Sequence, residues 1–250
     1  MYTKLSDRLM MIAEETEKGQ IVADIGTDHG FLPLFLIESG IAPKAILADI
    51  SKGSLEKARQ NVENYIQSCP QEERTCLRKC FDFRLGDGLS VIAESEADTV
   101  VIAGMGGILM AQILLADLRK TFSFKRLILQ PRNKAGHLMH ILEKNGIKVE
   151  KEQLVREGRF ICEIITAYPE AFPDRTYFSE EFPGFEYEAG ERLFRENPHE
   201  IASQYVLNRL RIHKEITDSI VSGKSSDSES LGHSQAAIEY LEGLLKRYGQ

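Results

Sequence analysis

The chain has 250 residues, 42% of them hydrophobic and 28% charged, so it is long enough and apolar enough to bury the core of a large α/β domain. No apolar run approaches the roughly 20 residues needed to cross a bilayer, and the N-terminal segment lacks a signal-peptide pattern, so membrane insertion and secretion are not expected. The net charge of −7, taken alone, argues against a nucleic-acid partner.

Short apolar runs alternate with helical patterns over the first two-thirds of the chain. Parallel strands that are buried on both faces have this continuous apolar character. The clearest helical pattern covers residues 54–66, with Ser51 or Ser54 as its N-cap. Strands are predicted at residues 21–25, 45–49, 83–85, 99–103 and 126–130. The alternation predicts an α/β fold with a doubly wound, Rossmann-like parallel sheet.

The pattern changes after the fifth predicted strand. Two β-rich runs, 147–155 and 160–167, are joined by a turn at 156–159 and predict a terminal antiparallel hairpin. Prolines then mark an acidic linker. From about Glu186 the chain reads as helical, and two apolar stripes on either side of a polar loop at 223–228 predict an antiparallel, coiled-coil-like helix pair. The stripes are Ile201, Tyr205, Ile212, Ile216 and Ile220, then Ile238, Leu241, Leu245 and Tyr248.

These patterns predict a Rossmann-like domain at residues 1–168, followed by a linker and a C-terminal helical domain at 169–250. The acidity lies mostly in the second part, which holds 9 basic and 15 acidic residues. The four cysteines include no C-x-x-C pair, which predicts free thiols in a reduced, cytoplasmic protein rather than a zinc site.

A basic run interrupts the otherwise balanced first part. No acidic residue occurs between Arg119 and Leu142. The run predicts a local basic face for nucleic acid on an acidic protein, the alternative being an ordinary solvated helix and loop. Its cationic residues are Arg119, Lys120, Lys125, Arg126, Arg132 and Lys134.

The turn after the first predicted strand is the strongest candidate site. Ligands of open α/β sheets bind beyond the carboxyl ends of the strands. The glycines of a dinucleotide fingerprint, G-x-G-x-x-G, let the backbone touch a pyrophosphate. Here Gly26 is followed by the bulky, polar Thr27, Asp28 and His29, so the turn lacks a pyrophosphate cradle. Together with Asp24 and Gly26, it suits a nucleoside that has a charged amino-acid end and no phosphate, such as S-adenosylmethionine (SAM).

The later strand ends add further polar groups for an adenosine. Asp49, which precedes Ile50, is placed to accept both ribose hydroxyl protons. The Asp87 carboxylate, flanked by Gly86 and Gly88, is suited to an adenine amine. The turn Ala103-Gly104-Met105 permits close backbone approach. At the fifth strand end, Gln130 and Asn133 are candidates for a base edge, and Arg132 and Lys134 for phosphate.

These motifs resemble one family. D-I-G-T-D-H-G-F-L-P, A-G-M-G-G and L-I-L-Q-P, with the leading Leu5-Ser6-x-Arg8-Leu9 and the helical pair, are similar to the bacterial tRNA adenine-N1 methyltransferases that modify adenine 22. The similarity covers nearly all of residues 4–168 and, beyond them, the architecture only. It implies a class I methyltransferase that uses SAM, releases S-adenosylhomocysteine and acts on tRNA. It also implies that Arg8 closes over a pocket formed by Asp24, Gly26, Asp28, Asp49, Asp87 and Gly104.

The chain departs from the family pattern at three places. Family members usually have Ala-Tyr in place of Gly30-Phe31, Glu in place of Asp49, and Asn in place of Arg132. An acid is kept at position 49, so the expected cofactor contact is preserved. At the fifth strand end, either Arg132 or Asn133 takes the position that contacts the base.

The expected chemistry requires alignment more than activation. Adenine N1 carries an in-plane lone pair, so no proton has to leave before it attacks a sulfonium methyl group. The product ring is cationic, and Asp28, with His29 second, is the candidate to stabilise it. No obligatory metal or covalent nucleophile is expected. The oligomeric state stays open, with a monomer favoured.

Other function classes remain as alternatives. A SAM-dependent methyltransferase acting on a small molecule or another RNA would share the same strand ends, but a small-molecule enzyme would not need a basic face. A non-catalytic RNA or protein adaptor would use the helical pair as a contact arm, although the intact polar strand ends argue against it. The missing third glycine and the terminal hairpin disfavour a nicotinamide dehydrogenase.

Overall fold

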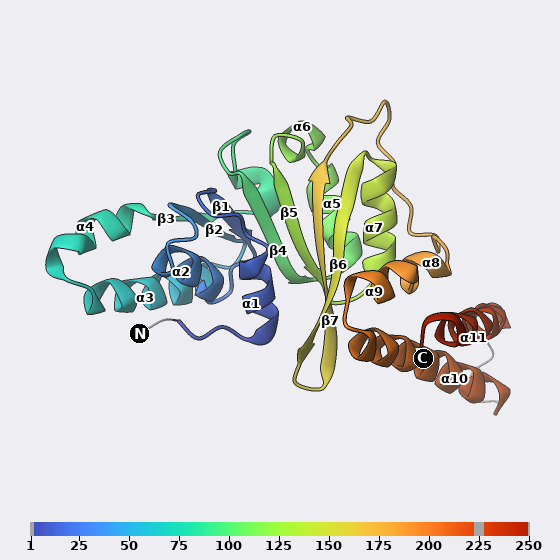
Figure 1. Ribbon diagram of the computed structural model, residues 1–250. Helices are drawn as coiled ribbons and strands as arrows, with labels where there is room; N and C mark the ends of the chain where they lie inside the picture. Colours follow the sequence, from blue (N-terminus) through green and yellow to red (C-terminus); the bar gives the residue numbers. More distant parts are fainter. Residues whose placement is uncertain (1–2, 223–227, 250) are drawn as a thin grey trace.

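The computed structural model describes residues 3–222 and 228–249, whose strands form one seven-stranded sheet in the order β3-β2-β1-β4-β5-β7-β6 (Figure 1). The strands are β1 (Val22–Ile25), β2 (Ala45–Asp49), β3 (Phe81–Leu85), β4 (Thr99–Met105), β5 (Arg126–Pro131), β6 (Ile147–Glu157) and β7 (Phe160–Pro169). The helices are α1 (Asp7–Glu14), α2 (Phe31–Glu38), α3 (Lys52–Ser68), α4 (Gln71–Lys79), α5 (Gly107–Leu115), α6 (Leu118–Thr121), α7 (Ala135–Lys144), α8 (Phe185–Glu188), α9 (Glu191–Glu196), α10 (His199–Val221) and α11 (Ser228–Tyr248), with a 3₁₀ turn, η1, at Gly88–Val91.

The first five strands are parallel, and both faces of this part of the sheet are covered. Successive side chains of a strand point to opposite faces. Val22 accordingly packs into the core beneath α1, α2 and α3, whereas the adjacent Ala23 packs into the core beneath α5 and α7. Burial on both faces explains the continuous apolar runs. The predicted α/β class, with its parallel sheet and terminal antiparallel hairpin, is confirmed.

The strand order reverses direction at β1 and β4. From β1 the chain adds β2 and β3 on one side, and from β4 it adds β5 on the other. Crossover connections diverge at such a point and leave a crevice beyond the carboxyl ends of the two strands. Gly26 directly follows β1, and Gly104 lies near the end of β4. The sheet topology therefore brings these two glycines to the same crevice.

The β6–β7 hairpin completes the sheet, and the chain then returns along α7. Tyr177 bonds through its backbone N–H to Asn145 Oδ1 at 2.9 Å. β6 is the edge strand on this side of the sheet, and the segment after α9 covers its outer edge. There Asn197 accepts a hydrogen bond from Leu154 N–H at 2.6 Å and donates one to Glu152 O at 2.8 Å. One side chain thus pairs with the edge strand as a neighbouring strand would, and it fastens the C-terminal helices to the sheet.

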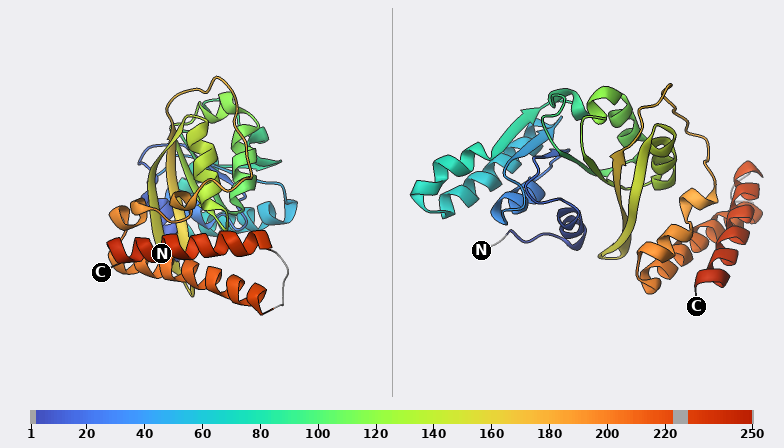
Figure 2. Two further views of the ribbon diagram at one scale, coloured as in Figure 1. Left: turned by 90° about the vertical axis from the view of Figure 1, so that its right-hand side faces the viewer. Right: turned by 45° about the horizontal axis from the view of Figure 1, so that its top comes forward.

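Helices α10 and α11 pack against each other; they lie below the sheet in the left-hand view of Figure 2 and beside the β6–β7 hairpin in the right-hand view. Their shared core confirms a helical pair, but the predicted stripe on the first helix is wrong in part. Ile212 and Ile216 are 41% and 37% exposed. The buried face of α10 carries Ala202, Tyr205, Val206, Leu210 and His213 instead. The small Ala202 and the polar His213 escape a search for large apolar residues. The predicted loop at 223–228 lies outside the described residues, apart from Ser228 at the start of α11.

None of the helices in the described ranges is long and apolar enough to cross a membrane. Within the same ranges, no three His, Cys, Asp or Glu residues gather in a way that would hold a metal ion. The four cysteines are free thiols.

Candidate functional site

A cavity of about 690 Å³ opens at the carboxyl ends of β1 to β4, and we call it the strand-end cavity. Its walls are the last residues of these strands and the loops that follow them. Residues of α1, α2 and α5 complete the lining. It contains every residue that the sequence predicts for cofactor binding: Arg8, Asp24, Gly26, Thr27, Asp28, Asp49, Ile50, Gly86, Asp87, Gly88, Ala103, Gly104 and Met105. The structure brings these residues together, and their contact with a cofactor stays a prediction.

Two glycines in left-handed conformations shape the floor of this cavity. Gly26 has a φ of +82°, and a Cβ atom there would collide with Met105 Cε. Gly104 has a φ of +78°, and the nearest atoms to a Cβ there would be guanidinium nitrogens of Arg132 at 3.7 Å. L-residues with side chains rarely adopt such backbone angles. Glycine at both positions therefore allows the turns and leaves the space between β1 and β4 open.

Hydrogen bonds to the backbone of the turn after β1 hold it in place. Gly26 N–H and Thr27 N–H both donate to Ala48 O, at 2.8 and 3.2 Å, which ties the turn to β2. Asn61 of α3 donates to His29 O at 2.9 Å. The loop that carries Asp28 is thus fixed by two neighbouring elements.

Asp24 is the most perturbed acid of this cavity. Burial raises its pKa to about 6, the nearby Asp49 adds to the increase, and the Thr27 hydroxyl and Arg8 oppose it. A buried carboxylate on a cavity wall is stabilised in its charged form by a cation that enters the cavity. The position therefore favours a ligand with a positively charged group at this end.

The remaining polar groups favour a nucleoside over a phosphate ester. Asp49 accepts from Ser51 N–H at 2.7 Å through one carboxylate oxygen, while Asp87 lies exposed after β3. With Asp24 and Asp28, four carboxylates line the cavity. Negative charge at this density repels a pyrophosphate but suits ribose hydroxyls, an adenine amine and an ammonium group. These hydrogen-bond acceptors thus fit SAM.

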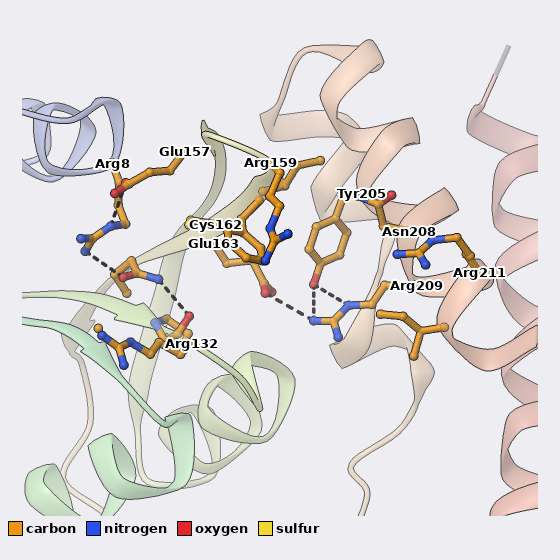
Figure 3. A pocket seen from close by; sticks show the side chains of 16 residues that line it. Arg8, Arg132, Glu157, Arg159, Cys162, Glu163, Tyr205, Asn208, Arg209 and Arg211 are labelled. Atoms are coloured by element: carbon orange, nitrogen blue, oxygen red, sulfur yellow. Dashed lines mark hydrogen bonds and ion pairs between the residues drawn. The ribbon is translucent and has the colours of Figure 1, made fainter. Parts of the chain in front are cut away.

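A second cavity of about 820 Å³ adjoins the first, between the end of β5, the β6–β7 hairpin and α10 (Figure 3). We call it the arginine cavity because five arginines line it: Arg8, Arg132, Arg159, Arg209 and Arg211. The two cavities share Arg8, Gly104 and Arg132. A ligand in the arginine cavity therefore reaches a strand-end ligand past these three residues.

Arg8 connects the parts of this junction. Its Nε donates to Glu157 Oε2 at 2.9 Å, and one of its terminal nitrogens donates to Gln130 Oε1 at 3.0 Å (Figure 3). Gln130 in turn donates to Pro131 O at 3.0 Å. Both polar atoms of the Gln130 amide therefore have a partner within the protein, and its oxygen positions Arg8. A contact of Gln130 with the substrate stays a prediction.

On the opposite wall, Arg209 connects the helical pair to the sheet. It donates to the Tyr205 hydroxyl at 2.8 and 3.1 Å and lies 3.5 Å from Glu163 of β7. Burial raises the pKa of Glu163, and Arg209 and Tyr205 oppose this increase. By contrast, within residues 3–222 and 228–249, Arg132 and Arg159 form no ion pair, so their positive charge is available to an anionic ligand.

The predicted basic run does not form one face, because β5 separates its two halves. Arg119, Lys120 and Arg126 lie at the amino end of β5, and Figure 1 shows α6 at the opposite end of the sheet from the hairpin turn. Arg126 pairs with Glu17 at 2.7 Å and Glu150 at 3.0 Å. Lys120 Nζ donates to Leu89 O at 2.9 Å. Their assignment to a site with Arg132 is therefore wrong.

The two candidate residues of the loop after β5, Arg132 and Asn133, line different cavities. Arg132 lines both cavities, whereas Asn133 and Lys134 line a smaller cavity of about 320 Å³ beside α7. Asn133 O accepts from Gly107 N–H at 3.0 Å, which fixes the loop against the end of β4. Of these two residues, Arg132 is thus the one that lies where the two cavities meet, and its contact with a base stays a prediction.

Asp28 and His29 line the strand-end cavity and not the arginine cavity. Their side chains lie 3.4 Å apart and are 65% and 43% exposed. His29 stacks on Phe31 with ring centroids 5.4 Å apart. Their catalytic role stays a prediction, and their position suits a contact with the cofactor better than one with the substrate.

Sequence reasoning missed the far wall of the arginine cavity. The missed residues are Glu157, Arg159, Phe160, Glu163, Tyr205, Asn208, Arg209 and Arg211. One signal was available, because the hairpin turn carries Arg-Glu-Gly-Arg-Phe and α10 carries Arg-Leu-Arg. Nothing in the spacing of these segments, about 50 residues apart, indicates that they face each other.

A family profile described as a methyltransferase domain matches residues 5–165, more than half of the chain. The chain belongs to this methyltransferase family. The membership confirms the methyltransferase expected from the strand-end motifs. The matched range ends within β7, so it includes the strand-end cavity and leaves α10 outside.

Individual relatives extend the likeness of this methyltransferase beyond that range. It is 37% identical to the tRNA (adenine(22)-N(1))-methyltransferase of Bacillus subtilis over 164 residues, which are 66% of this chain and 65% of that enzyme. It also resembles the crystal structure of the B. subtilis m1A22 tRNA methyltransferase TrmK, with a TM-score of 0.78, 30% identity and coverage of 97% of this chain and 99% of that one. A Streptococcus pneumoniae protein crystallised with S-adenosyl-L-methionine gives a TM-score of 0.74 at 27% identity, covering 95% and 99% of the two chains.

Proposed function

We propose that this methyltransferase transfers a methyl group from SAM to N1 of the adenine at position 22 of tRNA, in the cytoplasm. The observation that carries the proposal is the pair of joined cavities, one acidic and suited to SAM, the other basic and suited to RNA. The likeness to the B. subtilis enzyme supports the choice of base and position.

The strand-end cavity would hold SAM through groups of known chemistry. Asp24 faces a cation, Asp49 accepts from ribose hydroxyls and Asp87 accepts from the adenine amine, while Gly26 and Gly104 let the cofactor approach the backbone. SAM, when bound, supplies a methyl group on a sulfonium sulfur. The cofactor-bound S. pneumoniae relative supports this assignment.

The arginine cavity would take the target nucleotide. An adenine inside folded tRNA has to leave its stack before its N1 can reach a buried methyl group. The cavity volume of about 820 Å³ exceeds that of one nucleotide, and its walls combine unpaired arginines for phosphate with the apolar Phe160, Ile161 and Ile212 for a base. A small neutral substrate would not need this charge.

The residues at the junction of the two cavities would align N1 of the adenine with the methyl group of SAM. Arg8, held by Glu157 and Gln130, and Arg132 flank the passage between the cavities. A fixed passage brings N1 in line with the methyl group and keeps water away from it. N1 attacks with its own lone pair, and both cavities are formed by one chain, so the proposal needs neither a metal nor a second subunit.

The test is methyl transfer from radiolabelled SAM to an unmodified tRNA with adenine at position 22, followed by mapping through reverse-transcription arrest. We expect incorporation and an arrest at position 22, both lost when that adenine is replaced by guanine. Incorporation at another position would keep the enzyme class and overturn the choice of base. SAM binding without any incorporation into tRNA would overturn the RNA substrate and favour a small molecule.

A further inference from the structure

The turn of the β6–β7 hairpin presents an aromatic side chain to solvent. Phe160 is 62% exposed and belongs to none of the three hydrophobic cores within the described residues. It nevertheless lines the arginine cavity, so it lies at the edge of that cavity. A phenylalanine left in water forgoes the free energy gained by burying its ring, so packing within the described cores does not explain the residue.

The position of Phe160 is fixed relative to the reaction centre. In the hairpin, Phe160 lies opposite Glu157, with a two-residue turn between them. Glu157 accepts from Arg8 Nε at 2.9 Å and from the Ser6 hydroxyl at 3.3 Å. Figure 1 and the right-hand view of Figure 2 place this turn between α1 and α10. The exposed ring therefore sits on a hairpin that is anchored to the junction of the two cavities.

The surroundings of the ring indicate what covers it. The Arg159 guanidinium lies over the Phe160 ring, 5.0 Å from its centroid. Arg159 and Arg132, which line the same cavity, have no ion-pair partner in the described parts of the chain, whereas Arg211 pairs with Glu215 at 2.6 Å. An aromatic face beside unpaired arginines matches a nucleotide, whose base stacks and whose phosphate is anionic. A neutral apolar partner would match the ring but not the concentration of positive charge.

We propose that Phe160 stacks on a nucleobase of the RNA substrate at the edge of the arginine cavity and thereby helps to hold the target adenine out of its own stack. The inference rests on the proposed RNA substrate and adds a residue that contacts it. An aromatic ring that takes the place of a stacked neighbour lowers the free energy of the extruded state, because it offers the exposed base a new π-face.

The absence of tryptophan from the sequence allows a direct test of stacking. Phe160→Trp would carry the only indole of the protein, and stacking on a base quenches indole fluorescence. On titration with unmodified tRNA, we expect emission to fall about twofold or more and to saturate, as stacking on an aromatic side chain requires. The matched control is Phe178→Trp, which is also exposed, at 42%, but lines none of the cavities described here.

Kinetics then test what the stacking does. Phe160→Ala should lower kcat/KM for tRNA about tenfold, in line with the measured contribution of one base–aromatic stack, whereas Phe160→Tyr and Phe178→Ala should stay near wild type. A tRNA with an abasic site beside adenine 22 removes the stack that the ring replaces, so the loss in Phe160→Ala should shrink on this substrate. SAM affinity should not change.

The outcomes separate this inference from the proposed function. Equal quenching in both tryptophan variants, or none at position 160, would overturn the stacking role. So would a loss in Phe160→Ala that is the same on intact and abasic tRNA. If tRNA quenches the indole of Phe160→Trp but the wild-type protein, which also binds tRNA, transfers no methyl group, the proposed reaction is wrong while the stacking contact stands, because the fluorescence change does not depend on methyl transfer.

Discussion

The two joined cavities are built in different ways. The strand-end cavity takes its walls from short motifs that each follow one strand, and its floor is glycine backbone. The arginine cavity takes its walls from long side chains of α1, the loop after β5, the hairpin and α10. A backbone-built cavity is preorganised for a ligand of constant shape, whereas long charged side chains adapt to a large polyanion.

The two cavities also differ in the charges of the side chains that line them. Four carboxylates line the first cavity and five arginines the second, and Arg8 and Arg132 stand where they meet. An acidic chain can therefore bind RNA, because the arginines are concentrated at one place while the net charge stays at −7. Because the two cavities have different walls and charges, we expect that substitutions can weaken cofactor binding and RNA binding separately.

The largest effect is expected from filling the floor of the strand-end cavity. In Gly26→Val the new side chain would collide with Met105 and occupy the space between β1 and β4. SAM affinity should fall by more than about 100-fold, as for lost contacts of ~3 kcal/mol. Isothermal titration calorimetry with SAM measures it.

The control for this prediction is Gly19→Val. Gly19 has a φ of +87°, so valine causes a similar backbone strain, but a Cβ there meets nothing within 4 Å. Both variants should lose stability to a similar extent, about 1–3 kcal/mol, and only Gly26→Val should lose SAM. Equal losses of SAM affinity would show that strain, not the cavity, is responsible.

Reversing one charge of the arginine cavity should have the next largest effect. Arg132→Glu should weaken tRNA binding about tenfold at low salt and lower the salt-dependence slope by about one. Lys134→Glu, two residues further on, should change affinity far less, because Lys134 lines the cavity beside α7. Arg119→Glu at the other end of β5 is a second control. Filter binding across a salt series measures all three, and equal effects of the three substitutions would contradict a localised site.

An effect of the same size as that of Arg132→Glu is expected for the pH dependence of cofactor binding. The Asp24 carboxyl, with its pKa raised to about 6, is charged at pH 7 and mostly protonated at pH 5. If Asp24 pairs with a SAM cation, affinity should fall about tenfold between pH 7 and pH 5, one decade for each unit below the pKa.

Two variants identify the group responsible. Asp24→Asn should weaken SAM binding at pH 7 and flatten the profile. His29→Gln, which removes the imidazole from the same cavity, should leave the profile in place. In the ligand-free protein the sign is opposite, because burial favours the protonated acid. The contribution of Asp24 to stability is therefore greatest below its unfolded pKa and is lost as pH rises through about 6.

The sequence predicted the strand-end cavity well because its residues are local. Asp24, Gly26 and Asp28 belong to one turn, and the rule that parallel strands place their carboxyl ends together brings them to Asp49 and Gly104. Closeness in sequence is misleading for the basic run. Arg126 and Arg132 are six residues apart in sequence, but they lie at opposite ends of β5, where Arg126 pairs with Glu17 and Glu150.

The α/β sheet, the hairpin, the two C-terminal helices and the acidic strand ends could be predicted from the sequence, because periodicity and turn chemistry act over a few residues. Two features are visible only in the folded chain. Arg132, and not Asn133, reaches the junction of the cavities, and Arg159 and Arg209 line the arginine cavity from other elements. The cause is the docking of α10 on the hairpin. Contacts such as Asn197 with β6 and Arg209 with Glu163 join segments distant in sequence, and no local pattern encodes their distance in space.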